Sequence, residues 1–194
     1  MVNKYHFNRK ELIHDIEISI HEKTSRTSFK QNLLPILKKF IDKHSVNIKN
    51  IYMENKDGVG SGELRAKMID AVILTAFDAI NNFAFPIANP TTSDKLAVIT
   101  VGGYGRGNLS PGSDIDLLIL TPYKMTPRIE KIVETLLYLL WDLKLKVGYA
   151  VRSLEETIIK ARADNTICTA LLDARLISGN QDLWLKFNGY FKSE

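Results

Sequence analysis

The sequence has very little cysteine, and most of its length has no histidine. Its one cysteine, Cys168, excludes an internal disulfide and any zinc site built on a cysteine pair. The histidines all lie in the first quarter of the chain, at positions His6, His14, His21 and His44. Any chemistry after residue 44 therefore proceeds without imidazole, which excludes Ser-His and Cys-His nucleophile pairs from that part of the chain.

The sequence also lacks long apolar runs and a strong excess of one charge. Runs such as AVILTAF at 71–77 are far shorter than the about 20 residues of a membrane-spanning helix. The N-terminal stretch MVNKYHFNRKELIHD has no apolar segment of the secretory type. Lys and Arg number 26 against 22 Asp and Glu, and the basic residues are scattered. We therefore expect a cytoplasmic protein with neither a membrane nor a nucleic acid as its partner.

What is present is the composition of a globular protein, with 45% hydrophobic and 25% charged residues in 194 positions. Apolar residues at three- and four-residue spacing predict helices within 8–45 and again at 63–81. The pattern lapses over 45–62, where the sequence NKDGVGSGE is typical of a linker. We therefore predict an N-terminal helical segment with its linker at 1–60 and a second domain at 61–194.

The second domain alternates short strands with helices. Runs rich in β-branched residues predict strands at 96–101, 114–120 and 145–151. Capping residues and apolar spacing predict helices at 127–140, 153–162 and 166–178, the last one ended by Gly179. This order predicts an α+β fold, in which a small mixed sheet is flanked by helices and preceded by the helical segment.

The most informative stretch runs from Leu96 to Thr121 and holds only three charged residues in 26 positions: Arg106, Asp114 and Asp116. Side chains alternate along a strand, so the two aspartates project from the same face, about 7 Å apart. Two carboxylates in a partly dry site repel each other unless a cation lies between them. Mg²⁺ fits this need, because it binds carboxylate oxygens and keeps positions open for substrate phosphates.

The glycine-rich sequence GGYGRG precedes this aspartate pair. Gly102 and Gly103 allow backbone amides to approach an anion closely, and Arg106 and Ser113 can donate hydrogen bonds to phosphate oxygens. Each glycine alone is typical of a turn, and an isolated Asp-x-Asp is typical of a solvated strand edge. The spacing is neither that of a dinucleotide-binding loop nor that of a P-loop. Together, the glycines and the carboxylates favour metal-assisted phosphoryl transfer.

At these residues the sequence resembles the nucleotidyltransferase superfamily that includes DNA polymerase β. Gly102, Gly103, Asp114 and Asp116 match its Gly-Gly and Asp-x-Asp signature. The strings VGGYGRGNLSPGSDIDLLIL and LLYLLWDLKLKVGYAVRSLEE are similar to the catalytic domain of bacterial protein-PII uridylyltransferases, from about residue 60 to about residue 185. The resemblance implies transfer of UMP from UTP to a tyrosine of the PII signalling protein, with Mg²⁺ and release of pyrophosphate.

The sequence departs from that family in two respects. The family continues into a hydrolase domain and glutamine-sensing domains, so we expect this 194-residue chain to act as a transferase module without uridylyl removal or a direct glutamine response. Many superfamily members also carry a third carboxylate on the next strand, where this sequence reads VGYAVRS. The nearby acids are Glu155, Asp164 and Asp173, none of which sits at the expected place. For Glu155 and Asp173 we favour helix-capping or surface roles over contact with the metal. Arg152 and Arg175 are either phosphate contacts or members of surface ion pairs.

Two alternative functions are open at this stage. One keeps the fold and changes the substrate, giving a nucleotidyltransferase that acts on a small molecule or on another protein. The other is a module that binds a nucleotide or a partner and transfers nothing, which the missing third carboxylate allows.

Overall fold

The computed structural model describes residue 7 and residues 9–21 and 26–192. Three helices come first: α1 (Arg9–His21), α2 (Arg26–Asn55) and α3 (Gly58–Ala79), the last one continued by a π-helical turn at Ile80–Ala84. After a 3-10 turn at Thr92–Asp94 come the following elements: β1 (Ala97–Thr100), α4 (Gly102–Gly105), β2 (Ile115–Thr121), α5 (Pro127–Asp142), β3 (Val147–Ser153), α6 (Leu154–Ala163), α7 (Asn165–Leu172), β4 (Arg175–Gly179) and α8 (Gln181–Lys192).

The strands form one four-stranded sheet in the order β3-β2-β1-β4. β1 is antiparallel to both β2 and β4, and β2 is parallel to β3, so the sheet is mixed. The sequence-based prediction of an α+β fold with N-terminal helices and a small mixed sheet is therefore confirmed.

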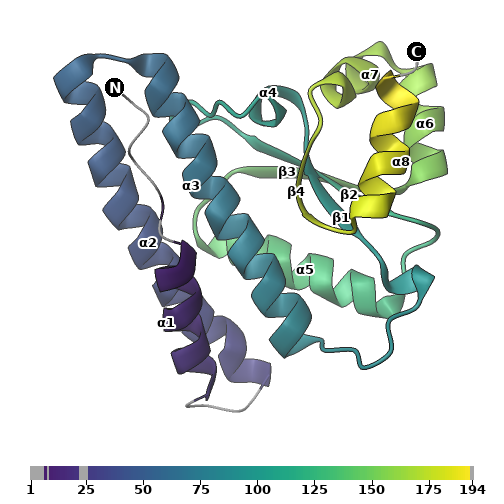
Figure 1. Ribbon diagram of the computed structural model, residues 1–194, viewed down its shortest axis with the longest axis horizontal. Coiled ribbons are helices and arrows are strands. Elements are labelled where there is room, and N and C mark those ends of the chain that lie inside the picture. Colours follow the sequence, from purple (N-terminus) through teal and green to yellow (C-terminus); the bar gives the residue numbers. More distant parts are fainter. Residues whose placement is uncertain (1–6, 8, 22–25, 193–194) are drawn as a thin grey trace.

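Side-chain alternation along the central strands gives the sheet two different apolar faces. Leu117 and Ile119 belong to the larger core, which α3 and α5 cover. Leu118 and Leu120 belong to a smaller core that includes residues of α6, α7 and α8. Figure 1 shows the resulting layers, with α3 and α5 on one side of the sheet and the three C-terminal helices on the other. Asp116, which is two residues before Leu118 on β2, therefore lies on the face that the C-terminal helices cover.

One predicted helix is partly a strand. The helix expected at 166–178 ends at Leu172, and the residues from Arg175 to Gly179 form β4, which pairs with β1. The edge of β1 opposite β2 would otherwise leave backbone N–H and C=O groups without partners inside the fold. Tertiary pairing therefore overrides the local helical pattern of this segment.

The stretch expected to be a linker is almost entirely helical. α2 continues to Asn55 and α3 begins at Gly58, so only Lys56 and Asp57 separate the two helices. Lys56 adopts a left-handed φ of 58°, and the Asp57 carboxylate caps α3 by accepting a hydrogen bond of 2.8 Å from the Gly60 N–H. The glycines of this stretch form the first turns of α3. The division into 1–60 and 61–194 stays a prediction.

Candidate functional site

The predicted carboxylate pair lies at the start of β2. Asp116 is half-buried on the strand, on the same face as Leu118, while Asp114 precedes the strand and is exposed. Burial raises the pKa of the Asp116 carboxyl, and the nearby charge of Asp114 raises it further. Among residues 9–21 and 26–192, neither side chain has an ion-pair partner or accepts a hydrogen bond. The site therefore holds two acidic groups without an ion-pair partner among the described residues.

The glycine pair lies directly beside Asp116. The expected turn is a single helical turn, α4, which begins at Gly102 with a left-handed φ of 59°. A Cβ at Gly102 would lie 3.7 Å from Oδ2 of Asp116. The N–H of Val101 donates a 3.1 Å hydrogen bond to the backbone carbonyl of Asp116, which fixes the loop to the strand. The structure thus brings the predicted phosphate loop and the predicted metal ligand together.

Arg106 and Ser113 lie at the two ends of the loop that connects α4 to β2, Arg106 directly after α4 and Ser113 directly before Asp114. The Arg106 guanidinium forms an ion pair of 2.5 Å with the Asp173 carboxylate, and its side chain is 63% exposed. An exposed pair of this kind contributes little stability, so Arg106 can exchange Asp173 for another anion at small cost. Ser113 is exposed next to Asp114, and its N–H donates to the carbonyl of Ser110.

A half-buried ionic network holds α4 in place. Asp70 on α3 accepts a 2.6 Å hydrogen bond from the Tyr104 hydroxyl and two, at 2.8 and 3.0 Å, from the Arg175 guanidinium. The Nε of Arg175 also donates to the carbonyl of Gly105. Burial, together with the charge of Asp70, raises the pKa of Tyr104 well above its usual value.

Sequence reasoning missed Asp70 and Tyr104, because Asp70 is 34 residues from one partner and 105 from the other. The sequence left two roles open for Arg175, a phosphate contact or a surface ion pair. The structure shows an ion pair with Asp70, which is half-buried and not on the open surface.

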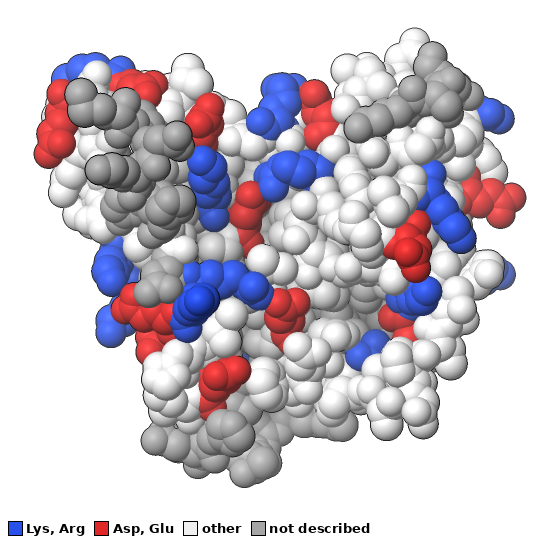
Figure 2. Space-filling view, in the orientation of Figure 1, with Lys and Arg blue, Asp and Glu red and all other residues white. Residues whose placement is uncertain are grey.

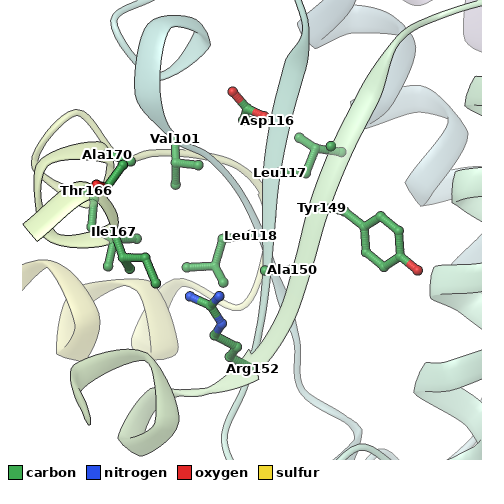
Figure 3. Close-up of a pocket in the computed structure, with 12 residues that line it drawn as sticks. Val101, Asp116, Leu117, Leu118, Tyr149, Ala150, Arg152, Thr166, Ile167 and Ala170 are labelled. Atoms are coloured by element: carbon green, nitrogen blue, oxygen red, sulfur yellow. The ribbon is translucent and has the colours of Figure 1, made fainter. Parts of the chain in front are cut away.

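A cavity of about 340 Å³ opens beside Asp116, between the sheet and α7. Figure 3 shows Leu118 and the guanidinium of Arg152 on its sheet side, with Ile167 of α7 opposite, whereas the Tyr149 ring points away from it. Within the described residues Arg152 has no ion pair, so its charge is available inside a cavity that also includes Asp116.

Among the residues that the structure describes, no third carboxylate joins the pair. Within the part of the chain that the structure describes, no cluster of three or more metal-ligating side chains occurs. Asp164 caps α7 by accepting from the N–H groups of residues 166 and 167, and Glu155 lies exposed in the first turn of α6. Gly148 of β3 stands next to Asp116, where a Cβ would lie only 2.8 Å from its Oδ1.

The surface of the molecule is hollowed near α4. Figure 2 shows a notch at the top of the view, where Figure 1 places α4, with basic and acidic side chains on its walls.

Within the described residues, none of the helices combines the length and the apolar character needed to cross a membrane.

Comparison with known proteins bears on what such a site does. The sequence model of the nucleotidyltransferase domain family matches residues 89–175, which include the glycine pair, both aspartates, β3 and the cavity. The chain contains a nucleotidyltransferase domain.

The nucleotidyltransferase domain is homologous to bacterial proteins named bifunctional uridylyltransferase/uridylyl-removing enzyme. The chain is 36% identical over 187 residues to that of Azospirillum brasilense, which is 96% of this chain and 20% of the relative. It is 40% identical over 179 residues to that of Rhodospirillum rubrum, with 91% and 19% covered. It is 39% identical over 161 residues to that of Caulobacter vibrioides, with 83% and 17% covered. The chain thus spans about one fifth of the length of these relatives.

Proposed function

We propose that this domain transfers UMP from UTP to a tyrosine hydroxyl of a PII-type signalling protein and releases pyrophosphate. The observation that carries the proposal is the half-buried Asp116, which lies beside the Gly102 turn and has no counter-cation from the described chain. The relatives are named bifunctional uridylyltransferase/uridylyl-removing enzyme, which supports uridylyl transfer as the reaction. The PII acceptor rests on the resemblance to protein-PII uridylyltransferases, and the proposed cytoplasmic location rests on the N-terminal sequence, which has no apolar segment of the secretory type.

We propose Asp114 and Asp116 as the ligands of a Mg²⁺ ion. The donor set fits this ion, because Mg²⁺ is held through one or two carboxylates and shares its remaining positions with substrate phosphates. Burial and then the charge of Asp114 raise the pKa of Asp116, and a cation bound between the two carboxylates would offset both effects. When bound, the ion supplies charge neutralisation at the attacked phosphate.

The other residues of the site act on the triphosphate. Gly102 and Gly103 leave room for phosphate oxygens beside the backbone of α4, and Ser113 offers a hydroxyl at the exposed end of the loop. Arg106 exchanges Asp173 for the leaving pyrophosphate, which it stabilises with its planar fork of donors. The tyrosine oxygen loses its proton to solvent and attacks the α-phosphorus, and the bond from that phosphorus to the bridging oxygen breaks, which releases pyrophosphate.

The test is incorporation of label from UTP into a PII protein, measured with Mg²⁺ and compared with label from ATP. We expect UTP to label the acceptor and ATP to fail. Asp114→Asn and Asp116→Asn should each lower the rate at least about a hundredfold, because loss of metal-assisted charge stabilisation costs several kcal/mol. Asp42→Asn, an exposed change on α2, is the matched control and should retain full activity. Labelling that persists in both site variants would contradict the proposal.

A second candidate function is favoured by one observation, the lack of a third metal-ligating side chain in the described residues. It is a module that binds nucleotide and metal without transfer. Titration with UTP and Mg²⁺, followed by an assay for pyrophosphate, separates the two functions. Saturable binding without pyrophosphate release, with a PII protein present, would favour the binding module.

A nucleotidyltransferase with another acceptor would label a different protein or small molecule and would still depend on Asp116.

A further inference from the structure

A second and larger cavity lies away from the carboxylates. It has a volume of about 880 Å³ and is bounded by the C-terminal half of α2, the first turns of α3 and the loop residues 108–111. It shares no lining residue with the cavity beside Asp116. Its volume falls within the range of about 300–1,000 Å³ that is usual for small-molecule sites.

The cavity is positively charged. Lys49, Lys56 and Arg65 line it, and the single acid among its lining residues is Asp57. The carboxylate of Asp57 is already used, because it accepts the hydrogen bond from the Gly60 N–H that caps α3. Three cations thus face one engaged carboxylate, which favours an anionic ligand.

Arg65 provides the second, independent observation. Its Nε is buried and has no hydrogen-bond partner in the described structure. Burial lowers the pKa of Arg65, although a guanidinium keeps its charge at neutral pH. Buried donors are almost always hydrogen-bonded in folded proteins. The Arg65 guanidinium lines the cavity and has no hydrogen bond or ion pair among the described residues, so it is available to an anion from outside the chain.

The remaining lining residues suit a ligand with a flat or apolar part. Tyr52 lines the cavity and is 40% exposed, with the Lys56 Nζ 5.8 Å from its ring centroid, and the buried Ile48 also lines the cavity. We propose that this cavity binds a phosphorylated small molecule of nucleotide size, with Arg65 and Lys49 on its phosphate and the Tyr52 ring against its flat portion.

This ligand would also touch the loop that leads to the carboxylates. The Asn108 side chain donates a 3.1 Å hydrogen bond to the carbonyl of Val59, and the Leu109 N–H donates one of 3.0 Å to the carbonyl of Gly62. A Cβ at Gly62 would collide with the Asn108 side chain, so the loop is packed directly on α3. Because the same loop continues to Asp114, occupancy of this cavity would brace one side of the candidate site.

The experiment is calorimetric titration of the full chain with ATP and with inorganic pyrophosphate, in EDTA. Binding is expected for both probes, and more tightly for ATP because it also contacts Tyr52. Arg65→Gln should weaken the Kd for ATP at least about tenfold, the usual effect of losing a charge-assisted hydrogen bond. Lys49→Gln should weaken the affinity for ATP severalfold. Because Lys49 is exposed, this variant should fold normally and keeps the test valid even if Arg65→Gln unfolds.

Lys67→Gln and Asp116→Asn serve as the matched controls. Lys67 is an exposed cation on α3 that does not line the cavity, so its loss should leave the Kd unchanged. Asp116→Asn should also leave it unchanged. The proposal is overturned if neither probe binds, or if Lys67→Gln weakens binding as much as Lys49→Gln does. The titration uses neither a divalent cation nor an acceptor protein, so its failure is distinguishable from failure of the proposed transfer reaction.

Discussion

Removing the carboxylate of Asp70 should destabilise the domain more than any other change to an acidic residue of α3. The substitution Asp70→Ala takes away three hydrogen bonds at once, one from the buried Tyr104 hydroxyl and two from Arg175. Tyr104 is 1% exposed, so water cannot replace its lost partner. The Arg175 side chain is 34% exposed, so water replaces part of the loss there.

The magnitude follows from these exposures. A hydrogen bond to a charged group contributes about 1.5–3 kcal/mol, and a buried donor left without a partner costs about 1–3 kcal/mol. Counting the Tyr104 bond fully and the Arg175 pair at a discount for its exposure gives a loss of about 3 kcal/mol for Asp70→Ala. Tyr104→Phe keeps the Asp70 pair with Arg175 and should cost about 1 kcal/mol.

Urea denaturation measures both changes through the shift of the midpoint at unchanged slope. The double variant is decisive, because Tyr104→Phe should cost almost nothing once Asp70 is absent. Glu63→Ala, an exposed change on the same helix, is the control and should stay within about 0.5 kcal/mol of the parent. A loss for Asp70→Ala no larger than that of the control, or strict additivity in the double variant, would refute the reasoning.

Three further predictions concern single positions. Gly148→Ala should displace the Asp116 carboxylate and lower the rate of nucleotidyl transfer, with little change in the urea midpoint, because the new Cβ meets the end of a side chain. Gly105→Ala should lower the midpoint instead, by about 2 kcal/mol or more, because its Cβ collides with the backbone carbonyl of Asp173. His44 is buried and burial lowers its pKa, so the unfolded chain takes up a proton more readily. The contribution of His44 to the free energy of unfolding should therefore be complete above the ordinary histidine pKa of about 6.5 and decrease as the pH drops below it. Urea midpoints at pH 7.5 and 5.5 measure this decrease. The variant His44→Leu should show a smaller difference between the two midpoints.

Features set by local spacing were predictable from the sequence. Thr126 caps α5 and Pro127 occupies its first position, and Ser153 and Glu156 form the expected capping box of α6. Each of these depends on atoms within a few residues of one another, which is why the pattern alone was sufficient. The shared face of the two aspartates stays a prediction, because β2 begins at Ile115 and Asp114 lies before it.

Other features depend on partners that are distant in the chain. The strand from Arg175 to Gly179 forms only because β1 offers it an edge, and its local sequence favoured a helix. The first turns of α3 replace the predicted linker because Asp57 caps the helix and the loop at Asn108 packs on it.

The sequence by itself determined which residues make up the candidate site: a glycine pair, an arginine and two acids in an apolar stretch, at a spacing that one turn and the start of one strand can present together. The tertiary structure decided which charges remain available for it. It joined Arg106 to Asp173 and Arg175 to Asp70, and it left Asp116 and Arg152 facing a cavity without an ion pair among the described residues. Pairing of charges depends on distances in space, and separation along the chain does not encode those distances.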